Sequence, residues 1–141
     1  MKTFKDKVAV ITGAGSGFGR QFALIGAARG MKLVLADIDA KSLEAVRDEL
    51  EAQGAQVVAQ RCDVRHAEQV QALADLAMER YGAVHLLFNN AGVGSGGLIW
   101  ENSIADWDWV LGVNLMGVVH GIRLFTPMML AAAAKDPAWQ G

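Results

Sequence analysis

A glycine-rich segment near the N-terminus has the residues needed to surround a phosphate group. Gly13, Gly15, Gly17 and Gly19 follow a short β-branched run and lead into a stretch that fits a helix. Glycine permits positive φ values and lets the backbone approach a ligand closely. A helix that begins here directs unpaired N–H groups and the positive end of its dipole at that ligand. These features favour a pyrophosphate site, although the same glycines also fit a plain tight turn.

The spacing of these glycines differs from the common dinucleotide-binding fingerprint. Phe18 stands where the pattern G-x-G-x-x-G requires its third glycine. The segment fits T-G-x-x-x-G-x-G instead, with Gly13, Gly17 and Gly19 at the fixed positions. The strand–loop–helix context strengthens the assignment of a nucleotide site.

Asp37 is the second residue with a defined chemical use. It ends an apolar run 18 residues after Gly19, close to the usual place of the carboxylate that accepts hydrogen bonds from the adenosine ribose. A carboxylate repels a 2′-phosphate, and neither Ser16 nor Ile38 supplies the positive charge that NADP requires. We therefore expect NAD rather than NADP. Helix capping is the alternative for Asp37, but Asp39 is better placed for that role.

Four apolar runs alternate with stretches of helical pattern. The expected strands cover residues 7–12, 32–36, 56–61 and 84–88, and the expected helices cover residues 16–29, 39–53, 66–81 and 106–134. Continuous apolar strands are typical of a parallel sheet that is covered on both faces. With right-handed crossovers, this predicts an α/β fold with a Rossmann-type doubly wound parallel sheet. Ser103 and Asp106 have capping-box spacing, and we expect the long helix to bend near Gly112 or Gly117.

The composition fits one domain with some uncovered apolar surface. The 141 residues have a net charge of −2 and allow a single NAD(P)-binding domain over residues 1–141. The near-neutral charge argues against nucleic-acid binding. Hydrophobic residues make up 52% of the chain and glycine adds 16 residues, which exceeds the usual share and indicates surface that a partner or more chain covers.

The remaining chemical groups point to a cytoplasmic protein without a metal. Cys62 is the only cysteine in the sequence, so we expect a reducing compartment. The N-terminus lacks the apolar stretch of a signal peptide. His120 and Arg123 interrupt the longest apolar helical stretch, so we expect no membrane contact. His66, His85 and His120 lack metal-ligand spacing, so we expect no metal site.

Several short motifs together resemble one enzyme family. They are T-G-A-G-S-G-F-G at residues 12–19, Asp37, Cys62-Asp63-Val64, Asn89-Asn90-Ala91-Gly92 and Val113-Asn114-Leu115. In this order and spacing they resemble the short-chain dehydrogenase/reductase family over essentially all of the chain. The resemblance implies an NAD-dependent oxidoreductase that moves a hydride between the nicotinamide and an alcohol or ketone.

The resemblance also implies roles for individual residues. Gly13, Ser16, Phe18 and Gly19 would hold the pyrophosphate, Asp37 and Ile38 the adenosine, Asp63 and Val64 the adenine, and Asn90, Ala91 and Gly92 the rest of the cofactor. The Asp63 carboxylate would accept from the adenine amino group. Asn114 matches the asparagine that holds a water in the family's proton relay. Asp63 alternatively caps a helix, and Asn89 and Asn90 alternatively tie neighbouring loops together.

The family's catalytic serine, tyrosine and lysine have no counterparts in this sequence. The resemblance requires tyrosine with lysine four residues later, but the one tyrosine is Tyr81 and position 85 is histidine. Ser95 and Ser103 precede the long helix, whereas the family's serine follows it. We therefore expect a fold that is cut after the long helix, without the family's fifth strand, and with residues 84–88 as an exposed sheet edge.

Two functions remain open on these grounds. The first is an oxidoreductase whose complete form acts on a small alcohol or ketone, with this chain as an inactive cofactor-binding half. The second is a catalytically inert fragment that binds only NAD or adenosine, or a structural remnant. A methyltransferase is a third interpretation, but Asn114 and the Asn-Asn-Ala-Gly motif argue against it. The resemblance further implies a homo-oligomer that pairs through the long helix, residues 106–134.

Overall fold

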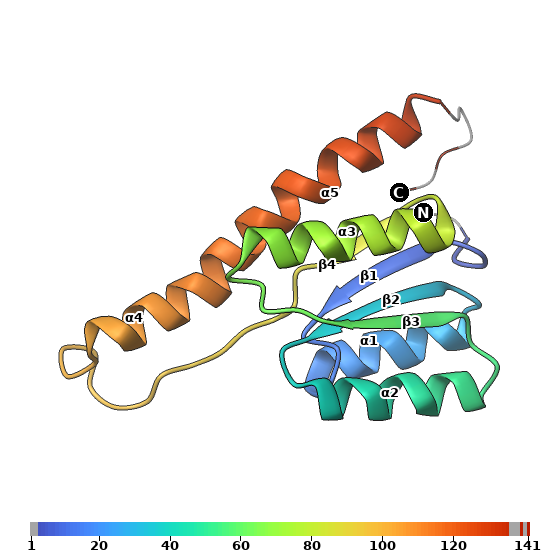
Figure 1. Cartoon of the computed structure of the whole chain (residues 1–141). Coiled ribbons are helices and arrows are strands. Elements are labelled where there is room, and N and C mark those ends of the chain that lie inside the picture. The colour runs from blue at the N-terminus through green and yellow to red at the C-terminus, as the bar shows by residue number, and fades with distance from the viewer. Residues whose placement is uncertain (1–2, 136–138, 140) are drawn as a thin grey trace.

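A computed structural model describes residues 3–135, 139 and 141 (Figure 1). The elements are β1 (Val8–Thr12), α1 (Gly17–Ala28), β2 (Lys32–Asp37), α2 (Ala40–Ala52), β3 (Val57–Arg61), α3 (Ala67–Tyr81), β4 (Leu86–Phe88), α4 (Ile104–Leu111), the π-helical segment η1 (Gly112–Met116) and α5 (Gly117–Ala133). Strands and helices therefore alternate as the sequence predicts.

The four strands form one parallel sheet in the order β3-β2-β1-β4. The strand β1 lies inside the sheet and pairs with β2 on one side and β4 on the other. This confirms the predicted Rossmann-type doubly wound parallel sheet. Within the described part of the chain β4 pairs only with β1, so it forms the sheet edge that the sequence analysis expects.

The strand β4 is shorter than the predicted residues 84–88, and His85 explains the difference. The backbone N–H of Val8 donates to the His85 ring at Nδ1, 3.1 Å away. The His85 N–H donates to the Val8 carbonyl at 2.9 Å. Because a side chain replaces one backbone acceptor, regular pairing with β1 begins only at Leu86, opposite Ala9.

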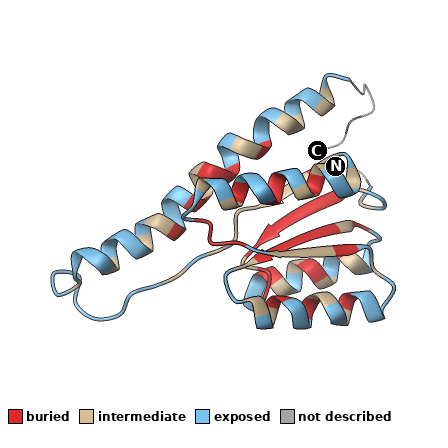
Figure 2. Cartoon of the chain, viewed as in Figure 1, coloured by how far each residue is buried: buried red, intermediate tan, exposed pale blue. Residues whose placement is uncertain are grey.

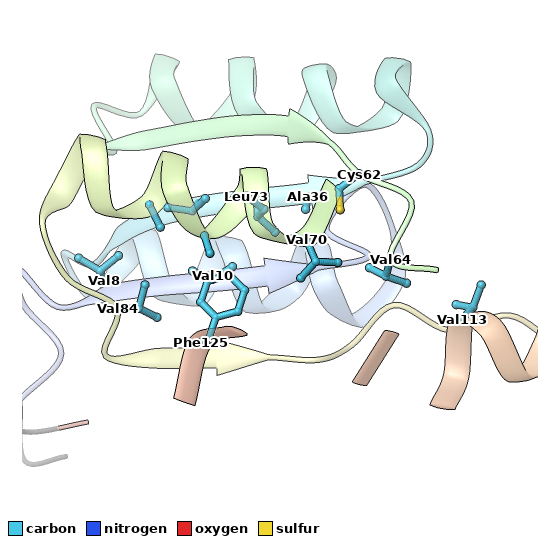
Figure 3. Close-up of a cluster of buried hydrophobic side chains, with 13 residues drawn as sticks. Val8, Val10, Ala36, Cys62, Val64, Val70, Leu73, Val84, Val113 and Phe125 are labelled. Carbon is cyan, nitrogen blue, oxygen red and sulfur yellow. The ribbon is translucent and has the colours of Figure 1, made fainter. Parts of the chain in front are cut away.

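Alternate residues of the central strands pack on opposite faces of the sheet. Val8 and Val10 of β1 belong to a buried cluster with residues of α3 and α5. Ala9 and Ile11 belong to a second cluster with residues of α1 and α2. Figure 1 shows these helix pairs on the two faces, and Figure 3 shows Phe125 of α5 among the valines of the first cluster. The sheet is thereby covered on both sides, which explains its continuous apolar strands.

The helical segments α4, η1 and α5 run on as one helix, in which α5 covers a face of the sheet beside α3 and begins close to the segments that follow β3 and β4 (Figure 1). A Cβ atom on Gly117 would lie 2.7 Å from Val64 Cγ2, and one on Gly121 would overlap Asn89 Oδ1. Only glycine allows so close an approach. The irregularity predicted near Gly112 or Gly117 is the π-helical segment between them. Short π-helical turns inside α-helices are frequent at functional sites.

This helix, Ile104–Ala133, is long and apolar enough to cross a membrane by length and composition, in spite of His120 and Arg123. One such helix is weak evidence for a membrane segment, because the core helix of a soluble protein passes the same test. Figure 2 shows α4 largely exposed and the buried residues of α5 facing the rest of the fold.

Candidate functional site

A cleft of about 450 Å³ lies at the carboxyl ends of the strands. It is lined by Gly13, Ser16, Gly17, Phe18, Asp37, Ile38, Cys62, Asp63, Val64, Asn90, Ala91, Gly92, Val93, Trp109 and Val113. The volume falls in the range of small-molecule and cofactor pockets. The position is where open parallel sheets bind ligands, because the chain order reverses between β1 and β4.

The cleft brings together ten of the eleven residues predicted to hold a cofactor. The exception is Gly19, which lies behind the loop, where a Cβ would overlap the Gly13 carbonyl oxygen. Gly19 thus shapes the loop without lining the cleft. The cofactor contacts of all eleven residues stay predictions.

Asn114, the predicted catalytic residue, also lies outside the cleft lining. Its Nδ2 donates to the Val93 carbonyl at 2.8 Å, and its Oδ1 accepts from the Val93 N–H at 2.9 Å. Both ends of the amide therefore hold the segment that follows the Asn-Asn-Ala-Gly motif. Its role in holding a water stays a prediction.

Thr12 and Asn90 join the loop after β1 to the loop after β4. The Thr12 hydroxyl donates to the Phe88 carbonyl at 3.2 Å and accepts from the N–H groups of Asn90 and Ala91, both at 3.0 Å. The Asn90 Nδ2 donates to the carbonyls of Thr12 and Gly13 at 2.9 and 3.3 Å. The loop-tying role considered for Asn90 is therefore present. Sequence analysis missed that Thr12 ties the two loops together, although its position at a strand end directly before a glycine could have indicated this role.

The N-terminus of α1 opens on the cleft without a capping side chain. Ser16, its N-cap residue, makes no side-chain hydrogen bond to the helix, and the first turn contains no acidic residue. By contrast, Asp39 caps α2, and Ser103 forms the predicted capping box with Asp106 at α4. The first N–H groups of α1 and its dipole are thus left for an anion in the cleft.

Asp37 presents a partly satisfied carboxylate at the end of β2. Its Oδ2 accepts from the Gly15 N–H at 2.8 Å, and its Oδ1 accepts from the Asp39 N–H at 3.0 Å. A Cβ on Gly15 would lie 3.0 Å from the same Oδ2, so glycine at this position admits the carboxylate. Each oxygen keeps another lone pair for a ligand hydroxyl.

Asp63 is paired with Arg65, which sequence analysis missed. Arg65 donates from Nη2 to Oδ2 at 2.6 Å, from Nε to both oxygens at 3.1 Å, and from its backbone N–H to Oδ1 at 3.1 Å. These hydrogen bonds lower the pKa of Asp63 below its usual value and raise that of Arg65. A Cβ on Gly112 would lie 3.0 Å from Arg65 Cδ, so η1 packs on the arginine stem. An adenine amino group that binds Asp63, as predicted, would have to share the carboxylate oxygens with the Arg65 hydrogen bonds.

The cleft is also lined by residues to which the sequence analysis assigned no cofactor contact, namely Gly17, Cys62, Val93, Trp109 and Val113. Gly17, Cys62 and Val113 belong to the quoted motifs, Val93 follows the Asn-Asn-Ala-Gly motif, and only Trp109 had no signal beyond its place on the helix, four residues before Val113 on one face. Figure 3 shows Val113 near Val64 in the first buried cluster. Burial raises the pKa of Cys62 to about 11, so its thiol stays protonated at neutral pH and is a weak nucleophile.

Tyr81 lies at the opposite end of the sheet from the cleft. It ends α3, and the Lys32 ammonium at the start of β2 lies 5.9 Å from its ring centroid. Burial raises the pKa of Tyr81. The ring packs against the first buried cluster, as expected of a structural residue.

The fold and cleft are those of a Rossmann-type α/β domain with a ligand cleft at the strand ends, and comparison with known proteins identifies the family. The family model described as short chain dehydrogenase matches residues 7–136. The chain therefore belongs to the short-chain dehydrogenase family, and the sequence resemblance is confirmed. The CLA biosynthesis dehydrogenase/reductase of Lactiplantibacillus plantarum is 42% identical over 130 residues, which cover 92% of this chain and 46% of that protein.

Solved structures of the family are also similar. A short-chain dehydrogenase/reductase from Burkholderia phymatum in complex with NAD is 62% identical, with a TM-score of 0.92, over 94% of this chain and 47% of that one. A metagenomic short-chain oxidoreductase in complex with NADP is 35% identical, with a TM-score of 0.86, over 92% of this chain and 60% of that one. The chain thus spans about half the length of the Lactiplantibacillus plantarum and Burkholderia phymatum proteins. These complexes support a nicotinamide cofactor without choosing between NAD and NADP.

Proposed function

We propose that this chain is the cofactor-binding part of an NAD-dependent oxidoreductase that acts on an alcohol or ketone. The cleft carries the proposal: it combines a glycine loop, a helix N-terminus without a capping side chain and the Asp37 carboxylate. Membership of the short-chain dehydrogenase family supports the oxidoreductase class.

The residues of the cleft fit a dinucleotide. Gly13 has a φ of +65° and lies so close to the next loop that a Cβ would sit 2.9 Å from Ala91 Cα, whereas nothing lies within 4 Å of a Cβ on Gly17. The loop therefore offers its backbone, with open space in front of it. The N–H groups at the start of α1 would hold the pyrophosphate, and Asp37 would accept from the ribose hydroxyls.

The other walls would hold the two ends of the cofactor. Ile38 and Val64 supply apolar surface on the side of β2 and β3, where the adenosine would lie, with Asp63 beside them. Asn90, Ala91 and Gly92 line the side of β4. The bound nicotinamide would supply the hydride acceptor or donor, while the protein binds and orients the cofactor.

The charge of the cleft favours NAD over NADP. No lysine or arginine is among the lining residues, and Asp37 would repel a 2′-phosphate. Arg61 lies beside this wall, but its Nε donates to the Ile38 carbonyl at 3.1 Å.

Asp37→Ala should weaken NADH binding roughly tenfold or more, because a carboxylate hydrogen bond to the ribose is lost. NADPH binding should weaken less or improve, because the repulsion is also lost. Titration calorimetry with both cofactors measures the two effects, with Asp75→Ala, at an exposed position of α3, as a control for the loss of one charge. Unchanged affinities for both cofactors would refute the role of Asp37.

A catalytically inert cofactor-binding module is the alternative, and the position of Tyr81 away from the cleft favours it for the chain alone. We expect no alcohol oxidation by the 141-residue chain. A chimera that continues after residue 135 with the second half of the Burkholderia phymatum protein should form NADH from NAD and a secondary alcohol. A folded chimera that binds NADH but oxidises no alcohol in a broad panel would contradict the oxidoreductase proposal.

We also propose a cytoplasmic homo-oligomer that pairs through residues 106–134. This helix has an apolar outer surface, formed by the half-exposed Leu115 and Ile122 and the exposed Leu130. Exposing apolar surface to water costs free energy, and such patches commonly mark protein–protein contacts. Sedimentation velocity at micromolar concentration should show a dimer or larger species, whereas Leu115→Glu should reduce it. A wild-type protein that sediments only as a monomer would rule this pairing out.

A further inference from the structure

The side chain of His85 makes contacts in two directions just before β4 begins. Its Nδ1 accepts from the Val8 backbone N–H at 3.1 Å and so belongs to the pairing of β1 with β4. Its ring stacks on the indole of Trp139, with 4.3 Å between ring centroids and an interplanar angle of 13°. Val8 begins β1, whereas Trp139 follows α5 in the chain. One side chain therefore joins segments that lie far apart in the sequence.

The backbone of Gly141 also lies close to this point. A Cβ on Gly141 would lie 2.5 Å from Trp139 Nε1 and 3.1 Å from the His85 carbonyl oxygen. A side chain at position 141 would therefore displace the indole. Figure 1 shows the C-terminal end on the side of the sheet where the strands begin, which is the side away from the cleft. The contact thus lies outside the site described above, at the start of the edge strand β4.

The plane of the His85 ring decides whether β1 and β4 stay joined here. An imidazole that accepts at Nδ1 is neutral and carries its proton on Nε2. The ring torsion of histidine has broad wells, so the residue itself does not fix the plane in which Nδ1 faces Val8. Val8 is 2% exposed and His85 8%, so a turned ring would leave the Val8 N–H without a partner, which costs free energy. The nearly parallel indole of Trp139 holds the ring in that plane.

We propose that Trp139 docks the segment after α5 on the start of β4 and acts through His85 to hold β1 and β4 together there. Trp139 is thus a positioning residue for His85, and the outer face of the His85 ring is its docking site. The docked indole also covers the start of a sheet edge, and proteins commonly protect such edges against pairing with other chains. The contact does not depend on the cofactor, because neither residue lines the cleft.

Hydrogen exchange of single amides in the 141-residue chain, followed by NMR, tests this role. Trp139→Ala should speed exchange of the Val8 N–H roughly three- to tenfold, the size of one aromatic contact. The Ala14 N–H is the reference, because it donates to the Ala36 carbonyl at 3.0 Å at the other end of the sheet. Its exchange should stay unchanged. Trp139→Phe should restore the protection of Val8, because it keeps a planar ring.

His85→Phe separates the stack from the hydrogen bond. It keeps a ring for Trp139 but removes the acceptor, so Val8 exchange should rise while the Trp139 indole N–H keeps its ring-current shift. Trp100→Ala is the matched control for the loss of one indole, because Trp100 is 76% exposed in the segment before α4. It should leave Val8 exchange unchanged.

Two results would overturn the inference. Unchanged Val8 exchange in Trp139→Ala would show that Trp139 does not act through His85. An equal rise at Val8 and Ala14 would show that the variant only lowers the stability of the whole sheet.

Discussion

The hydrogen bonds around Thr12 and Asn90 fix the place of the cleft. Thr12 is 4% exposed at the end of the central strand, where buried polar groups must find partners within the fold. Its hydroxyl and the Asn90 amide satisfy groups of both loops, so the segments after β1 and β4 cannot separate freely. The glycine loop therefore has a fixed wall opposite it. The sheet order sets this wall at the reversal point, and the open N-terminus of α1 gives the space between the walls its preference for an anion.

Glycine contacts place the remaining wall. The long helix reaches the strand ends only because Gly112 and Gly117 lie against Arg65 and Val64. That contact brings Trp109 and Val113 to the cleft and sets Asn114 against Val93. The same helix leaves much of its outer side in water, as Figure 2 shows, so one element both completes the site and carries the surface proposed for self-association.

Local signals made most of the fold and much of the cleft predictable. Asp39 and Ser103 cap helices through neighbours a few residues away, and motif residues at parallel strand ends must share one edge. The other features depend on long-range packing. The Val93 partner of Asn114 is 21 residues away, and the histidine that shortens β4 bonds to Val8, 77 residues away. No local pattern specifies such contacts.

The central claim is that the cleft at the carboxyl ends of the strands binds a nicotinamide dinucleotide. Titration of the ¹⁵N-labelled chain with NADH, followed by amide chemical shifts, tests it most directly. The account predicts the largest shift changes at Gly13, Ser16 and Gly92, with Gly54 and Gly82 at the ends of α2 and α3 hardly affected. Absence of shifts at millimolar NADH, or changes centred away from the cleft, would contradict it.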